Sequence, residues 1–203
     1  MSLLIYFLVA LVLSFVGSLP IGLISLTITQ KTIEKGRRSG LLIASGAMVM
    51  EFGYTYLALI SLELFSKNLD LGSYIKIFAT VLFLILGVYY FFKKPSSELK
   101  KTKKYDYFDF LRGVVVGFMN VLILPYWIFV GMWLESNGML FTNQTDILTF
   151  SIGATLGAFL AFLVYIWFSK MIKNKIQTIN QYTNKMVGVL FIGLGIFQLV
   201  NLL

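Results

Sequence analysis

The sequence has no cysteine and no histidine, only three prolines, and few charged residues, which make up 13% of its 203 positions. Disulfide bonds, thiolate nucleophiles, the usual zinc sites and imidazole acid–base chemistry are therefore excluded. An ordinary soluble domain has about 25% charged residues. Hydrophobic residues instead reach 58%. The composition predicts an all-α integral membrane protein that is not an enzyme and carries no metal or organic cofactor.

Six apolar segments are long enough to span a bilayer, which takes about 20 residues of helix. The first continues past Pro20 and has no basic residue ahead of its apolar run, so we expect a span here and not a signal peptide. The six segments cover residues 3–29, 41–62, 74–92, 113–134, 147–169 and 186–203.

Lysine and arginine gather in alternate loops. Of the 17 basic residues, all but Lys67 and Lys76 follow the first, third or fifth segment. The positive-inside rule then predicts a multi-pass membrane protein with both termini outside. Because orientation accounts for the net charge of +8, we expect the lipid bilayer as surroundings and no nucleic-acid partner.

The chain divides into two halves that resemble each other. Residues 1–92 form one set of three spans and residues 113–203 another, joined by a basic linker at 93–112. "SLPIGL" matches "ILPYWI", "SGAMVMEF" matches "IGATLGAF", and "LILGVYYF" matches "IGLGIFQL". Three spans per half place equivalent loops on opposite sides, as their charges indicate. The pattern predicts two inverted three-helix repeats, which are typical of secondary transporters with a substrate site near the midplane.

Two prolines fall inside spans. Proline lacks a backbone donor and clashes with the preceding turn, so helices one and four are predicted to be broken at Pro20 and Pro125. Carbonyls freed in a bilayer need partners in protein or in a wet cavity, and the N-terminus of a half-helix attracts a carboxylate. A kink that serves only packing is the alternative. The polar or small residues beside the breaks that we expect to bind substrate are Ser18, Gly22, Asn120 and Tyr126.

Glu51 lies within the second span, and small or polar residues, with Tyr54 and Thr55 among them, share its helix face. A carboxylate facing lipid costs about 2.5–3.5 kcal/mol, so Glu51 is predicted to point into the bundle. A proton or a cation can neutralise a carboxyl there. We expect Glu51 to bind the substrate or the coupling ion; a protonated glutamate hydrogen-bonded for structural reasons is the alternative.

The residues around the breaks resemble the lysine exporter (LysE) superfamily of bacterial amino-acid efflux proteins. The stretches that carry the resemblance are "GSLPIGLISLTITQKTIEKGRRSGLLIASGA" and "GFMNVLILPYWIF". The departures are Ile21 between Pro20 and Gly22, and Val121 where proline usually follows the asparagine, which indicate a divergent branch. The resemblance implies a protein of the bacterial plasma (inner) membrane that exports a small amino acid or related metabolite, coupled to a proton or another ion.

These patterns together predict antiport, in which Glu51 holds either the ammonium of an amino-acid-like substrate or a proton. Rocking of one repeat against the other would then give access to each side in turn. Two other classes stay open: a cation or metal exporter, and a non-transporting membrane assembly protein. The sequence also leaves open whether the protein forms a homodimer.

Overall fold

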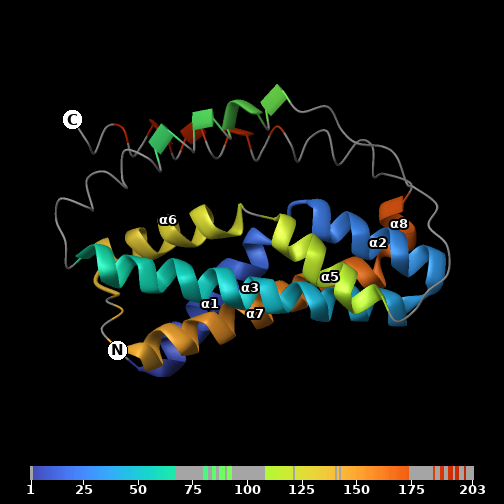
Figure 1. The fold of residues 1–203 in the computed structure, drawn as a ribbon, viewed down its shortest axis with the longest axis horizontal. Helices are drawn as coiled ribbons and strands as arrows, with labels where there is room; N and C mark the ends of the chain where they lie inside the picture. The colour runs from blue at the N-terminus through green and yellow to red at the C-terminus, as the bar shows by residue number, and fades with distance from the viewer. Residues whose placement is uncertain are drawn as a thin grey trace.

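The computed structural model describes residues 2–66 and 108–173, except 121, 140 and 142, together with separate helical positions between 80 and 92 and between 185 and 199. Every element in these parts of the chain is an α-helix (Figure 1). In chain order the helices are α1 (Leu3–Gly17), α2 (Leu23–Lys35), α3 (Arg37–Ser66), α5 (Phe108–Met119), α6 (Ile123–Ser136), α7 (Gln144–Trp167) and α8 (Ser169–Lys173).

Two of these helices are long and apolar enough to span a membrane: α3 over Arg37–Leu62, and α7. The pair α5 and α6 would form a third span, bent by 59° at a short break, and α1 is a shorter apolar helix. The prediction of an α-helical membrane protein is therefore confirmed. The third and sixth predicted spans lie mostly outside the described residues.

The first broken span is interrupted at Pro20. Helix α1 ends at Gly17 and α2 begins at Leu23. The side chain of Ser25 then caps α2, because its hydroxyl accepts the N–H of Gly22 at 2.8 Å and donates to the carbonyl of Gly22 at 3.1 Å. Pro20 interrupts the helical hydrogen bonds because it has no N–H group, and Ser25 caps the start of the helix that follows.

The second break lies ahead of Pro125, not at it. Helix α5 ends at Met119 and α6 begins at Ile123, so Pro125 falls in the first turn of α6. The first four N–H groups of a helix have no partner inside the helix, and a proline there costs little. Pro125 therefore lies in the first turn of the second piece of this span, and the break occupies the turn that precedes it.

Helices α3 and α7 run in opposite directions. A hydrogen bond between Gln144 and Tyr56 sets the start of α7 beside the C-terminal part of α3. An ion pair between Lys35 and Asp109 sets the end of α2 beside the start of α5. Helix α1 packs along α7 and α5 packs along α3, and the helices of each of these two pairs are parallel.

Glycines let these helix pairs approach to backbone contact. A Cβ atom at Gly153 or Gly157 of α7 would collide with the backbone of α1, and one at Gly46 or Gly113 would collide across the α3–α5 contact. The third and sixth predicted spans meet similarly, since a Cβ at Gly188 would lie 2.6 Å from the amide nitrogen of Phe91. Small residues at such contacts are common in membrane helices, where close packing drives association.

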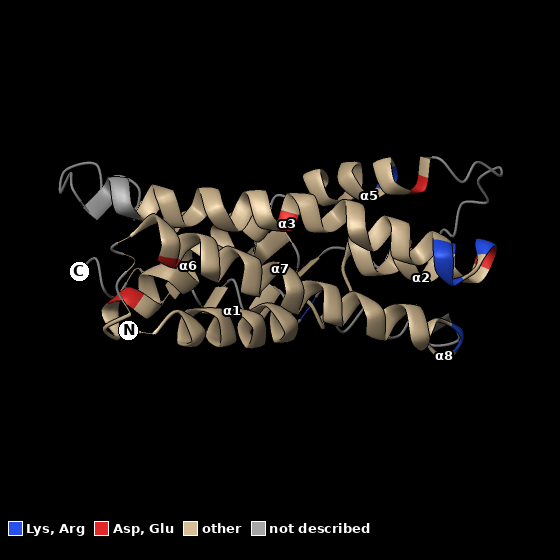
Figure 2. Ribbon diagram, turned by 90° about the horizontal axis from the view of Figure 1, so that it is seen from below, with Lys and Arg blue, Asp and Glu red and all other residues tan. Residues whose placement is uncertain are grey.

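Lysine and arginine gather at one end of the bundle, at the ends of α2 and α5 that meet there and at α8 (Figure 2). We call this the basic end. Helix α5 begins at Phe108, so the last five positions of the linker predicted at 93–112 are helical. At the opposite end, Tyr6, Phe141 and Phe150 pack in a row with ring centroids 5.2–5.6 Å apart. We call this the aromatic end.

Candidate functional site

Glu51 lies inside the bundle, near the middle of α3, with 5% of its surface exposed. Its Oε1 accepts a hydrogen bond from Nε1 of Trp127 at 3.1 Å. No lysine or arginine among the described residues forms an ion pair with it. Within the described parts of the chain, the carboxyl group therefore has one neutral donor and no cation.

Trp127 lies four residues after the start of α6, and its indole contacts Glu51 from this first part of the helix. Its side chain is fully buried and meets the rings of Tyr126 and Phe150 edge-on, with centroids 5.0 and 5.4 Å away. An indole N–H can only donate a hydrogen bond, so it binds the carboxyl oxygen whether or not the group is protonated. The aromatic row thus runs from Glu51 towards the aromatic end.

Tyr126 joins the neighbourhood of Glu51 to the first broken span. Its hydroxyl donates to the carbonyl of Leu13 in α1 at 3.1 Å. Gly17, the last residue of α1, lies against the same side chain, and a Cβ added there would come within 2.8 Å of the hydroxyl. A side chain from the second half therefore contacts the last turn before the break in the first half.

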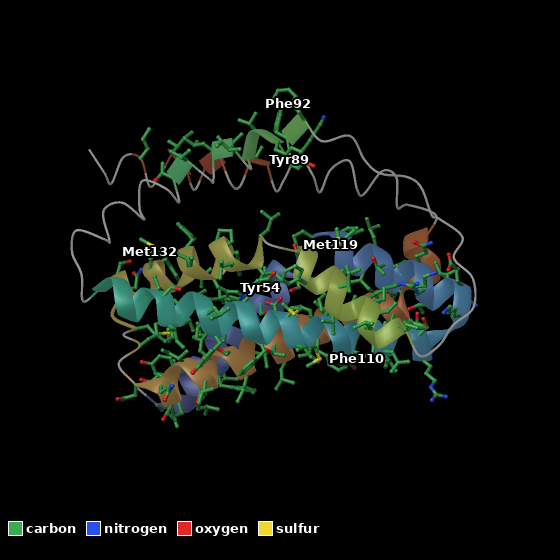
Figure 3. The ribbon with its side chains drawn as sticks, viewed as in Figure 1. Tyr54, Tyr89, Phe92, Phe110, Met119 and Met132 are labelled. Carbon is green, nitrogen blue, oxygen red and sulfur yellow. The ribbon has the colours of Figure 1, made fainter. Side chains whose placement is uncertain are left out.

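Two predicted site residues near Glu51 do not hydrogen-bond to its carboxyl group. Thr55 donates to the backbone carbonyl of Glu51 at 2.7 Å. Tyr54 donates to the carbonyl of Phe118, at the end of α5, also at 2.7 Å (Figure 3 labels Tyr54). Both hydroxyls thus bind backbone, and Tyr54 does so beside the second break.

The predicted residues of the breaks differ in burial. Pro20 and Gly22 are exposed and Ser18 is half-buried, and no described hydrogen bond links them to Glu51. In the second break Asn120 is half-buried and Pro125 is buried. The structure therefore places Tyr126 against Trp127, the hydrogen-bond partner of Glu51. The predicted residues of the first break have no described hydrogen bond to Glu51.

Tyr165 of α7 was not among the predicted residues. Its hydroxyl donates to the carbonyl of Leu19, inside the first break. A tyrosine in the fifth span carries no local signal of a contact with the first span. Trp127 was missed as a partner of Glu51 for the same reason.

A second acid, Asp109 of α5, is fully buried at the basic end. Its carboxylate accepts hydrogen bonds from Ser39 at 2.7 Å and from Arg112 at 2.9 Å. Lys35 lies 3.4 Å away. These four residues form the basic-end cluster, which ties α2 and α3 to α5.

Three hydroxyl oxygens in the first broken span are buried without a hydrogen-bond partner among the described residues. Ser14 lies before the break, and Thr29 and Thr32 lie after it. A serine or threonine inside a helix often bonds to the carbonyl four residues earlier, and these three do not. They are therefore available to another polar group.

Apolar helices, one span bent at a break and an acid in mid-span together define an α-helical membrane protein with a polar centre. The family model for LysE type translocators matches residues 15–202. The chain belongs to that family, whose members are membrane transporters, so the predicted resemblance is confirmed. No curated protein and no solved structure matches the chain.

Proposed function

We propose that this protein is a secondary transporter that exports a small amino-acid-like solute in exchange for a proton, with Glu51 as the acid that both bind. One observation carries the proposal: Glu51 is buried in mid-span with an indole donor and no described cation. An acid inside a membrane is costly and usually marks a substrate or proton pathway.

The surroundings of Glu51 suit a solute that bears an ammonium and a carboxylate. Because its described hydrogen-bond partner is neutral, the carboxyl group can take one positive partner, either a proton or the ammonium. The broken spans offer the complementary charge, since the N-terminal turn of a half-helix has free N–H groups and a positive dipole end. Trp127 lies in the second turn of α6, so Glu51 is near such a helix start.

The arrangement of the helices supports two inverted repeats. The first piece of each broken span packs along the unbroken helix of the other half, α1 along α7 and α5 along α3. Glycines make the close contact in both pairs. Inverted repeats move by rocking around a site near their interface, which gives alternating access. By this assignment the basic end faces the cytoplasm of a bacterial cell.

The proposal is tested by counterflow in proteoliposomes that contain the purified chain. Liposomes are loaded with one unlabelled amino acid, and entry of its labelled form is measured with and without a pH gradient. Lysine, glutamate, leucine and threonine sample the side-chain classes. We expect flux with at least one of them, and Glu51→Gln should lower proton-driven flux by about tenfold or more, which is about 1.4 kcal/mol in a barrier.

Glu34→Gln is the matched control, because this acid lies at the basic end and pairs with Lys31. It should retain the flux. Unchanged proton-driven flux in a well-folded Glu51→Gln variant would contradict the role of the acid. Flux that follows a metal cation and none of the amino acids would favour a cation exporter.

A further inference from the structure

Each broken span leaves a backbone carbonyl without a helical donor at its break. The carbonyl of Leu19 lies between α1 and α2, outside both helices. The carbonyl of Phe118 is in the last turn of α5, where the groups that follow no longer form the helix. Inside a membrane an unsatisfied carbonyl costs several kcal/mol, so each of these two needs a donor from elsewhere in the protein.

A tyrosine hydroxyl supplies the donor in both places. Tyr165 of α7 donates to Leu19, and Tyr54 of α3 donates to Phe118 at 2.7 Å. Figure 3 shows Tyr54 on α3 and Met119 where the ribbon of α5 ends. Each tyrosine comes from the unbroken helix of one half and binds the break of the other half.

The first break is held by two separate sets of hydrogen bonds. Tyr165 donates to the carbonyl of Leu19, and Ser25 accepts the N–H of Gly22 and donates to its carbonyl. The first set fixes Leu19, and the second fixes the start of α2. A rigid break fixes the direction of the free N–H groups at the start of the half-helix. A preorganised binding site needs donors that are fixed in this way.

We propose that Tyr54 and Tyr165 are positioning residues that hold the two span breaks in place, each acting across the boundary between the halves. The inference rests on the proposed function, because the breaks flank the proposed substrate site. It adds that the local order of each break depends on the opposite half of the chain. A motion of one half against the other therefore strains or releases these two hydrogen bonds.

The absence of cysteine allows a direct test with single-cysteine reporters. Ile21 lies in the first break and Ile123 begins α6 after the second, and the two are 6% and 7% exposed. The purified Ile21→Cys and Ile123→Cys variants in liposomes are treated with N-ethylmaleimide, and the rate of modification is measured. A buried thiol reacts only when its surroundings open, so the rate reports local opening.

Phenylalanine removes each hydroxyl and keeps the ring. We expect Tyr165→Phe to raise the rate at Ile21→Cys by about fivefold, the factor for one neutral hydrogen bond, and to leave Ile123→Cys unchanged. Tyr54→Phe should do the reverse. Tyr56→Phe is the matched control on α3, since its hydroxyl binds the side chain of Gln144 and no break, and it should change neither rate.

Three results would overturn the proposal: no change at either reporter, an equal rise at both reporters in each variant, or the same rise with Tyr56→Phe. The second would mean general loosening of the bundle. The labelling experiment needs no substrate. If Glu51→Gln failed to lower flux, the proposed function would fail while the labelling result stayed valid. If the labelling rates did not change, the role of the tyrosines would fail while the flux result stayed valid.

Discussion

Glu51, Asp109 and Asp146 are the buried acids of the described residues, and the surroundings of the first two differ. Asp109 has no exposed surface and is bound by Arg112, Lys35 and Ser39. Glu51 is 5% exposed, and the indole of Trp127 is the partner that its carboxyl group has among the described residues. A buried acid that is already paired with cations holds helices together. A buried acid with a neutral partner can still gain a positive one, which is what a transport site requires.

The largest effect we expect is on stability, from Asp109→Asn. The change leaves Lys35 and Arg112 without their acid, and breaking a buried pair in this way costs about 3–5 kcal/mol. Arg112 has 30% of its side chain exposed and can turn to water, so we expect the lower end of that range. The measurement is the free energy of unfolding in bicelles, from titration with sodium dodecyl sulfate followed by circular dichroism.

Glu51→Gln is the matched comparison for Asp109→Asn, because it also replaces a buried acid by its neutral amide. The amide carbonyl of glutamine can still accept the N–H of Trp127, so the free energy of unfolding should change by less than about 1 kcal/mol. Flux should show the opposite ranking, with Glu51→Gln the more damaging. Equal losses of stability from the two substitutions would mean that Glu51 has a structural role like that of Asp109.

A middle-sized effect is expected from Trp127→Phe. The ring still fills the space against Phe150, but Oε1 of Glu51 loses its described donor, which should cost about 1–3 kcal/mol of unfolding free energy. Trp133→Phe is the control, because Trp133 is 49% exposed and should change stability by no more than about 0.5 kcal/mol.

A double-mutant cycle sharpens this prediction. In a Glu51→Leu background the carboxyl group is gone, so the further loss caused by Trp127→Phe should shrink. The difference between the two backgrounds measures the coupling between the two side chains. An identical loss in both backgrounds would show that the cost came from packing and not from the hydrogen bond.

The sequence predicted the features that depend on neighbours along the chain. Glu51 points inward because the residues one and two turns away on α3 are small or polar, and the first span breaks where Pro20 removes a donor. The second span breaks in the turn before Pro125, and the proline itself lies in the first turn of the helix that follows. Local chemistry alone does not decide whether a proline ends one helix or begins the next.

The partners of these residues could not be predicted. Trp127 and Glu51 are 76 positions apart, Tyr165 and Leu19 are 146 apart, and Lys35 and Asp109 are 74 apart. Such contacts depend on how the helices pack, and no local pattern encodes them. Asp109 even fell in the stretch predicted as a solvated linker, although it begins α5 and is buried.

The smallest effect concerns Glu34, an exposed acid at the basic end. Burial raises its pKa, but hydrogen bonds from Lys31 and Gln30 and the charge of Lys31 outweigh burial, so the pKa of Glu34 lies below its ordinary value. A lowered pKa stabilises the folded state above the unfolded value of about 4.3, and this contribution is lost as the pH falls through the folded value.

Glu34→Gln should therefore lower the unfolding temperature slightly at pH 7, and the difference from the native chain should disappear near pH 3. Because the side chain of Glu34 is 27% exposed and lies three residues from Lys31, the pair should contribute only about 0.3–0.5 kcal/mol. High salt should remove the same difference, since water screens this pair, whereas it should hardly change the effect of Asp109→Asn. If salt changed the effects of Glu34→Gln and Asp109→Asn equally, water would have access to Asp109. Asp109 and Glu51 would then differ only in their hydrogen-bond and ion-pair partners.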